Sequence, residues 1–495
     1  MIIGDREKKV NKEKLKSQMT SGMIWKFSER FIAQGVSFVV SMVLARILSP
    51  EDYGAVAIIN IFISIADIFL SSGLNTSLIQ KKDADDLDFS TIFYLNFGLS
   101  VVLYLIMFIT APLIAHAYNL PILKSAIRVF AVRLPVSAFQ VVQVAYISKK
   151  MQFKKFFFAT IGGTLLSAVI GITMALKGFG VWALIGQYLT NTVVDTMILW
   201  ATVKWIPKKM FSFKAATPLI KYSWKVMMTD LLGTLCNNLG SFIIGTKYNS
   251  ANLAYYTKGK QLPLLFRDNI YTTLISVLFP GISVVNDDIT AVKTITRKSM
   301  RIMSYIVFPI SLGLMAAGKT IVEILFTAKW LPMLPYVYIM CVETIISVPA
   351  TIALQPIKAV GRSDLMLKTE IIKKISFVIL TVVAMNFGIF AIALTIPVNT
   401  LLDLIVNAII NKKIINYNLV EELSDCFTAL VLSFIMAIVV AFIGETELTI
   451  CIKAAIQIVS GVLCYTGISW MTKNKEFSYI LNVAMKCLKK CNEFN

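Results

Sequence analysis

The sequence predicts an all-α polytopic membrane protein with 14 transmembrane helices. Of its 495 residues, 57% are hydrophobic and 15% are charged, and the mean hydropathy is +0.73. A soluble domain holds roughly 45–50% apolar and about 25% charged residues, so this apolar surplus exceeds what a soluble core encloses. Apolar stretches of about 20 residues, the length that crosses a bilayer, recur along the whole chain. The gaps between them leave no room for a soluble catalytic domain.

Most of the predicted spans are separated by glycine, proline, asparagine or clustered charges, which commonly end helices. The spans cover residues 20–45, 53–79, 89–113, 121–146, 156–176, 180–203, 217–245, 251–282, 299–323, 331–357, 366–386, 388–410, 424–444 and 450–471. The basic N-terminus is long, and no cleavage site follows the first apolar stretch. We therefore expect no removable signal peptide.

The net charge of +20, from 48 Lys and Arg against 28 Asp and Glu, needs an explanation because basic chains often bind nucleic acid. If the N-terminus is cytoplasmic, 31 of the 48 cations fall in inner segments and 8 in outer loops, when residues at the adjoining span ends are counted with the loops. This is the positive-inside pattern, and it predicts that both termini are cytoplasmic. Aromatic residues do not alternate with exposed Lys and Arg residues, so we do not expect the protein to bind nucleic acid. Anionic lipids are the expected partners of the inner loops.

An internal repeat divides the chain. Residues 178–195 (GFGVWALIGQYLTNTVVD) align without gaps with residues 386–403 (NFGIFAIALTIPVNTLLD). The identical positions include Phe179/Phe387, Gly180/Gly388, Ala183/Ala391, Asn191/Asn399, Thr192/Thr400 and Asp195/Asp403. The offset of 208 residues corresponds to six helices. Six is an even number, so the repeats run in parallel about a pseudo-twofold axis along the membrane normal.

The repeat predicts how the chain is organised. A cytoplasmic segment (1–19) precedes an N-lobe of six helices (20–210) and a C-lobe of six (211–415). Two additional helices (416–472) and a cytoplasmic amphipathic tail (473–495) follow. Two parallel bundles suit a transporter whose substrate site lies between the halves and opens to alternate sides of the membrane. A scaffold built by gene duplication is the alternative.

Polar residues inside the spans supply the candidate site, because ionisable groups in a membrane are costly and usually face a cavity or a partner. Several recur every three or four residues and so share one helix face. Arginine offers a planar fork to phosphate oxygens, and lysine offers a point charge. The substrate-binding candidates are Lys26, Arg30, Gln34, Asn60, Arg133, Asn237, Lys258 and Arg267.

Intramembrane carboxylates are candidates for gating or for binding a coupling ion, H⁺ or Na⁺: Glu29, Asp67, Asp195, Asp230, Asp268 and Asp403. Asp195 and Asp403 have an equally good structural interpretation, bonding between helices. Glu343 stands isolated in its span. The seven cysteines are scattered and His116 is the single histidine, so we expect no metal, no cofactor and no catalytic residue.

Two segments carry a family resemblance. Residues 44–58 (LARILSPEDYGAVAI) and 178–189 (GFGVWALIGQYL) resemble motifs of bacterial polysaccharide exporters. With the 14 spans and the duplication, the chain resembles the Wzx-type oligosaccharidyl-lipid flippases. These belong to the MATE-like multidrug/oligosaccharidyl-lipid/polysaccharide (MOP) superfamily, and the closest branch is that of colanic and teichuronic acid exporters.

The resemblance implies a cargo. It is an undecaprenyl-diphosphate-linked oligosaccharide, moved from the inner to the outer leaflet of a bacterial cytoplasmic membrane for lipopolysaccharide, O-antigen or capsule synthesis. A polysaccharide polymerase and glycosyltransferases are the implied partners. The diphosphate needs cations at membrane depth, and Arg30, Arg133, Lys258 and Arg267 offer them.

Three alternatives stay open. A cation-coupled multidrug antiporter favours an anionic, aromatic cavity with few arginines. A lipid II flippase has a similar cavity, and sequence separates it poorly. A polytopic polymerase or ligase carries a large outer loop with catalytic residues, whereas the longest outer loop here offers His116 alone. We therefore expect a transporter and not an enzyme.

Overall fold

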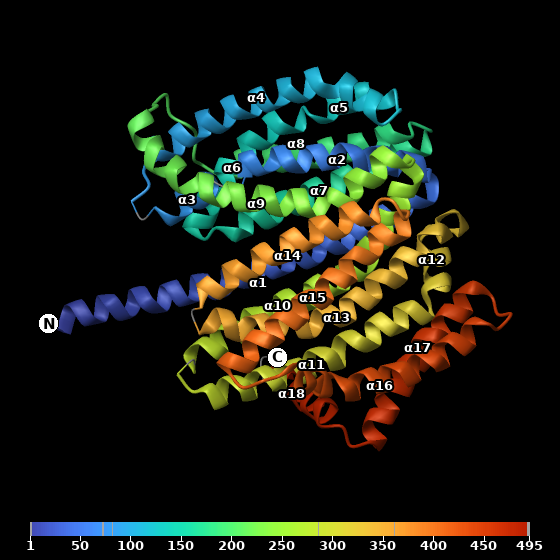
Figure 1. Ribbon diagram of the computed structural model, residues 1–495. Coiled ribbons are helices and arrows are strands. Elements are labelled where there is room, and N and C mark those ends of the chain that lie inside the picture. Colours follow the sequence, from blue (N-terminus) through green and yellow to red (C-terminus); the bar gives the residue numbers. More distant parts are fainter. Residues whose placement is uncertain (1, 72–73, 82, 286, 361, 493–495) are drawn as a thin grey trace. The chain divides into compact units, whose positions relative to one another are not determined.

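The computed structural model describes residues 2–71, 74–81, 83–285, 287–360 and 362–492. These residues are helical apart from short connections (Figure 1). By their contacts they form two compact units, Met1–Ala254 and Tyr255–Asn495. The helix α9 packs on α2, α3 and α4 of the first unit, whereas the repeat places it at the start of the C-lobe.

The helices of both units follow the predicted spans closely. The first unit contains α1 (Ile2–Ile47), α2 (Pro50–Ser71), α3 (Leu74–Gln80), α4 (Asp86–Ala117), α5 (Ile122–Phe130), α6 (Arg133–Lys150), α7 (Phe153–Leu176), α8 (Val181–Thr202) and α9 (Phe213–Lys247). The helix α10 (Ser250–Val284) crosses the boundary. The second unit continues with α11 (Ile289–Ala316), α12 (Gly318–Phe326), the short 3₁₀ helix η1 (Ala328–Met333), α13 (Leu334–Ala359), α14 (Ser363–Ala384), α15 (Ile389–Ile414), α16 (Leu419–Gly444), α17 (Ile450–Met471) and α18 (Lys475–Asn492).

Within the described residues, ten helical stretches are long and apolar enough to cross a membrane. The four remaining predicted spans coincide with α8, α9, α10 and α14, which are helical but more polar. Large apolar side chains lie on the outer surface, and on α17 Ile458, Val462 and Leu463 are each more than half exposed. Soluble proteins rarely expose such patches. The chain is therefore an all-α polytopic membrane protein.

The turn between α1 and α2 is fixed by hydrogen bonds, by a proline and by a close backbone contact. Ser49 and Asp52 bond reciprocally, since the Ser49 N–H donates to Asp52 Oδ2 (3.1 Å) and the Asp52 N–H donates to Ser49 Oγ (3.2 Å). Pro50 opens α2, where its missing N–H costs nothing. Gly54 passes so close to Ser250 that a β-carbon there would overlap the Ser250 carbonyl. The exporter-like motif thus builds a corner.

The repeated glycines have a backbone role. Gly180 and Gly388 directly precede α8 and α15, with φ of 54° and 104°. Residues with a β-carbon rarely adopt such angles, whereas glycine does so readily. The two copies of the repeat therefore begin their helices in the same way.

Some predicted spans are interrupted: 299–323 is divided into α11 and α12 at Ala317, and 331–357 begins in η1 before α13. The stretch 121–146 is split into α5 and α6 around Ala131 and Val132. Pro135 explains the break, because proline lacks an N–H and its ring clashes with the carbonyl four residues earlier, here that of Ala131. Arg133 consequently sits at the start of a helix rather than in the middle of one.

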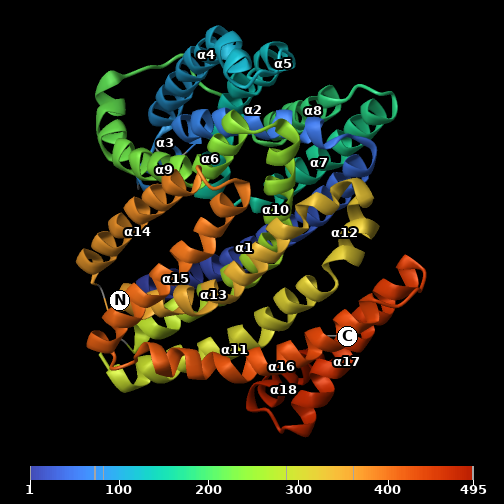
Figure 2. The same ribbon diagram turned by 45° about the vertical axis from the view of Figure 1, so that its right-hand side comes forward.

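The tail helix α18 packs on the second unit (Figure 2). Phe477 and Ile480 contact its apolar core, which is built mainly from α11, α13 and α16, and Leu481 stays exposed. The side chains of Ala484 and Leu488, which complete the predicted apolar face, lie outside the described set.

Candidate functional site

Three predicted site residues meet in the first unit. Arg133 Nη2 lies 3.4 Å from Asp67 Oδ2, and the two side chains are 28% and 30% exposed. Asn60, two turns before Asp67 on α2, lies near the Tyr188 hydroxyl, which also lies near Arg133. Arg133 Nε has no hydrogen-bond partner among the described residues. The guanidinium is therefore held by one carboxylate and keeps donor capacity.

A second group of predicted residues surrounds α1. Lys26 pairs with Glu29 one turn away (3.1 Å) and lies over the ring of Phe156. Glu29 is buried and acts electrostatically on Asp195, which is also buried. Asp195 fits against Gly163 of α7, where a β-carbon would overlap its carboxylate. These contacts tie α1, α7 and α8 together.

Other predicted residues of the first unit stay outside these groups. Arg30 is exposed and Gln34 is partly exposed on α1. On α9, Asp230 and Asn237 are exposed.

The next residue along α9, Asn238, was missed by the sequence reasoning. Its Nδ2 donates to Ser64 Oγ of α2 (3.4 Å). A step of one residue turns about 100° around a helix, so Asn237 and Asn238 cannot serve the same face.

The strongest polar constellation lies in the second unit, around Arg267 of α10. Its Nη1 donates to both Glu343 oxygens at 2.8 Å, and its Nε donates to Asp268 Oδ1 at 2.9 Å. The Glu343 side chain is 5% exposed and that of Arg267 is 20% exposed. Thr400 of α15 also donates to Glu343 (3.4 Å). One cation is thus enclosed by two carboxylates.

The view of Glu343 as isolated is wrong. It is the main partner of Arg267, which precedes it by 76 residues. No local spacing in a sequence reveals a pair so far apart. The sequence did offer one signal. An unpaired carboxylate inside a membrane span is energetically unfavourable, which implies a partner for Glu343.

Lys258 and Lys260 lie on α10 two turns before Arg267. Lys258 donates to Gln261 (3.2 Å), and Lys260 lies over the ring of Tyr256 at 4.8 Å from its centroid. The predicted cation Lys258 therefore shares a helix with Arg267 without joining its carboxylate cluster.

The two repeated aspartates occupy matching places. Asp403 of α15 faces Lys373 of α14 (3.8 Å), as Asp195 of α8 faces α7. In each, Oδ1 lacks a hydrogen-bond partner among the described residues. Each aspartate thus packs against the preceding helix of its own unit, which fits the structural interpretation.

Chemically, the Arg267 cluster suits an exchange of anions. Carboxylate and phosphate offer similar oxygen geometry to a guanidinium, so a phosphate-bearing ligand competes with Glu343 and Asp268 for the same donors. Among the described residues, no group of three or more His, Cys, Asp or Glu could hold a metal ion.

Comparisons with known sequences agree on one class of protein. Residues 43–335 match the family described as "Polysaccharide biosynthesis protein". The lipopolysaccharide biosynthesis protein WzxC of Escherichia coli K12 is 25% identical over 404 residues, 80% of either chain. The succinoglycan biosynthesis transport protein ExoT of Rhizobium meliloti is 22% identical and covers 94% of this chain and 95% of its own. The teichuronic acid biosynthesis protein TuaB of Bacillus subtilis is 21% identical over 81% of this chain and 84% of its own.

Two solved structures share the fold. The lipid II flippase MurJ, in an inward closed conformation, superposes with a TM-score of 0.74 at 13% identity, over 94% of this chain and 99% of its own. An inward-facing MATE-family multidrug resistance transporter of the MOP superfamily gives 0.62 at 14% identity, over 77% and 94%. At these identities the likeness concerns architecture alone.

Proposed function

Because the chain belongs to the polysaccharide biosynthesis protein family of Wzx-like flippases, we propose that it moves an undecaprenyl-diphosphate-linked oligosaccharide from the inner to the outer leaflet of a bacterial cytoplasmic membrane. It is a multi-pass polysaccharide biosynthesis transport protein and not an enzyme. Its relatives are named for lipopolysaccharide, succinoglycan and teichuronic acid biosynthesis.

The observation that carries the proposal is the Arg267 cluster. A lipid diphosphate needs a cation within the membrane, and a bare cation there is costly. Glu343 and Asp268 supply counter-charges while no ligand is bound, and both lie within 2.9 Å of Arg267. The diphosphate then replaces one of them on the guanidinium, so the charge is never left without a partner.

The remaining candidates have lesser roles in this mechanism. Arg133 and Lys258 offer further cations, and Asn60 beside Tyr188 offers hydrogen bonds to sugar hydroxyls. The prenyl tail stays in the lipid while the headgroup crosses by alternating access. Glu29, Asp67, Asp230 and Asp268 are the candidates for coupling to H⁺ or Na⁺. Flipping in liposomes that is independent of imposed H⁺ and Na⁺ gradients would remove the coupling role.

The proposed topology has 14 spans, with both termini cytoplasmic and two parallel six-helix bundles followed by two further helices. The helices α8, α9, α10 and α14 contain 22, 35, 35 and 22 residues, and each is long enough to cross. Labelling with a membrane-impermeant maleimide in a cysteine-free background tests this. A cysteine at Lys412 should react only after permeabilisation, and one at Glu447, in the exposed loop before α17, should react in intact cells.

The function is tested by replacing Arg267. In a strain lacking this chain, Arg267→Gln should abolish surface glycan even when export is normalised to the amount of inserted protein, which loss of the ion pair lowers. Arg267→Lys should rescue part of the export, because the charge remains while the fork is lost. Full export by Arg267→Gln would refute the assigned role. Vesicles loaded with lipid II test the alternative cargo directly.

A further inference from the structure

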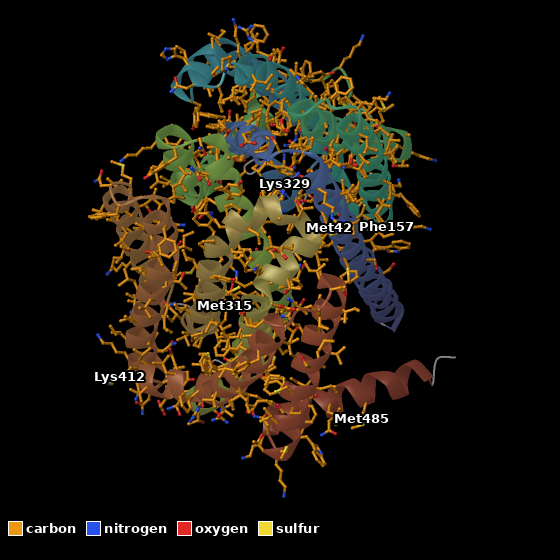
Figure 3. All side chains as sticks on the ribbon, turned by 90° about the vertical axis from the view of Figure 1, so that its right-hand side faces the viewer. Met42, Phe157, Met315, Lys329, Lys412 and Met485 are labelled. Atoms are coloured by element: carbon orange, nitrogen blue, oxygen red, sulfur yellow. The ribbon has the colours of Figure 1, made fainter. Side chains whose placement is uncertain are left out.

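A cavity of about 330 Å³ lies in the second unit, apart from the Arg267 cluster. Its walls come from the first half of α11, the start of α16 and the turn into α18, which lie side by side in Figures 1 and 2. Figure 3 labels Met315 near the opposite end of α11 and Met485 on α18. The volume falls within the range of about 300–1,000 Å³ that is usual for small-molecule sites.

The wall on α11 carries two arginines that share one carboxylate. Arg297 donates through Nε and Nη2 to Asp425 at 2.7 and 2.9 Å, and Arg301 does the same at 2.9 and 2.7 Å. The Asp425 side chain is 2% exposed. Tyr417 also donates its hydroxyl to Asp425 (2.8 Å). The arginines are thus held rigidly by a buried anchor.

Each guanidinium keeps an unused donor. Nη1 of Arg297 and of Arg301 makes no hydrogen bond to any described residue, and the two side chains are 35% and 41% exposed. Three cations and two carboxylates line the cavity, because Lys475 and Glu476 join the group around Asp425. One positive charge remains in excess. The hydroxyls of Ser424 and Thr428 complete the polar wall.

Two cations beside the start of α4 in the first unit differ in this respect. There, Lys208 pairs with Asp86 and Lys81 pairs with Asp88, each at 2.6 Å. Those cations are neutralised one to one by the acidic segment that begins α4. The cavity on α11 instead keeps charge and donors available for an anion.

We propose that this cavity binds the phosphodiester headgroup of an anionic phospholipid from the inner leaflet. Paired arginines suit phosphate oxygens, and basic groups at the inner surface attract anionic lipids. Phe427, which precedes the lining residue Thr428, is 62% exposed, and Trp470, four residues before the lining residue Asn474, is 74% exposed, so both can contact acyl chains. The proposal rests on the cytoplasmic orientation of the proposed function, and not on the cargo.

Such a lipid links elements that few direct contacts join. The helix α18 contacts α11 and α17, and near its beginning Lys298 lies over the ring of Tyr479 at 4.1 Å from its centroid. A headgroup that contacts Arg301 and Lys475 at once bridges α11 and α18. The lipid should therefore hold the tail helix in place.

The test is a titration of the purified full-length protein in detergent with short-chain phosphatidylglycerol, followed by native mass spectrometry. Arg301→Gln/Lys475→Gln should weaken binding at least fivefold, because Arg297 and Tyr417 still hold Asp425 while the ligand loses two cations. Lys412→Gln/Lys413→Gln removes the same charge at the exposed end of α15 and should bind as wild type. Short-chain phosphatidylcholine should bind at least fivefold more weakly than phosphatidylglycerol.

The outcomes separate the possible ligands. Binding by Arg301→Gln/Lys475→Gln at wild-type affinity would overturn the proposal, as would equal binding of phosphatidylcholine. Competition by glycerol 3-phosphate or inorganic phosphate as strong as that by the lipid would assign the site to a free phosphate compound and overturn the lipid. If the double variant fails to fold, Thr428→Trp fills the cavity without removing charge and should give the same loss. Export measured in parallel distinguishes this site from the transport site, because Arg267→Gln should retain lipid binding.

Discussion

Replacing Arg267 should destabilise the protein more than replacing its ion-pair partner Glu343. Arg267→Gln leaves the Glu343 carboxylate buried with Thr400 at 3.4 Å as its remaining charge-stabilising donor. Removing one partner of a buried pair costs about 3–5 kcal/mol, and we expect the lower end because glutamine still donates a hydrogen bond. Glu343→Gln is milder, because Arg267 keeps both bonds to Asp268. Loss of the charge-assisted bonds there costs about 1.5–3 kcal/mol.

The double variant distinguishes a specific pair from two independent effects. With both charges gone, two neutral glutamine amides face each other, and replacing both partners of a bond costs little. We expect the double variant to lie within about 2 kcal/mol of wild type, whereas the two single variants together lose about 4.5–6 kcal/mol, so the coupling energy should be at least about 2.5 kcal/mol. The measurement is equilibrium unfolding by SDS in mixed micelles, followed by tryptophan fluorescence.

A surface pair provides the matched control. Lys374 and Glu370 lie one turn apart at 3.8 Å and are 38% and 51% exposed. Their double-mutant cycle should give a coupling of less than about 0.5 kcal/mol, as exposed helix pairs do. If Arg267 and Glu343 also couple by less than about 0.5 kcal/mol, the buried pair does not form and the reasoning fails.

Two further predictions concern packing and motion. Gly54→Ala should destabilise the protein by about 1–3 kcal/mol and lower its folded yield in detergent, because the new methyl group overlaps the Ser250 carbonyl. Gly98→Ala, with open space around it, should be neutral or stabilising, and equal yields for the two would contradict this account. A short thiol cross-link between Ser64→Cys and Asn238→Cys should arrest export reversibly if α9 moves with the C-lobe. Undiminished export by cross-linked protein would assign α9 to the first unit instead.

The sequence predicted the helices well and the contacts between them poorly. Long apolar stretches and their separators located nearly every helix, and the repeat identified Gly180 and Gly388, whose positive φ angles explain their identity. The break before Arg133 was missed even though Pro135 signals it. A span is predicted from the apolar character of many residues together. The break in it comes from one proline, and one residue hardly changes that pattern.

Partners distant in the chain were beyond such reasoning. Lys373, which faces Asp403, lies 30 residues before it on another helix, and Glu343 meets Arg267 only after the chain has turned back. Some of the predicted intramembrane charges, such as Arg267 and Asp403, do face an opposite charge, whereas Arg30 and Asp230 are exposed. Which partner a charge meets depends on how the helices rotate and pack against one another. The spacing of polar residues along one helix holds no information about this packing.

The corner between α1 and α2 has a consequence for engineering. Asp52, within the exporter-like motif, lies against Gly180 at the start of α8, and Gly54 lies against Ser250 at the start of α10. Residues 44–58, which resemble the exporter motif, therefore fix how α2 packs against the starts of α8 and α10. They contain no part of the Arg267 cluster. Chimeras between exporters of different glycans should take residues 44–58 and the start of α10 from one parent. The rest of α10 should be exchanged together with α13, so that Arg267 stays with its own carboxylate, Glu343.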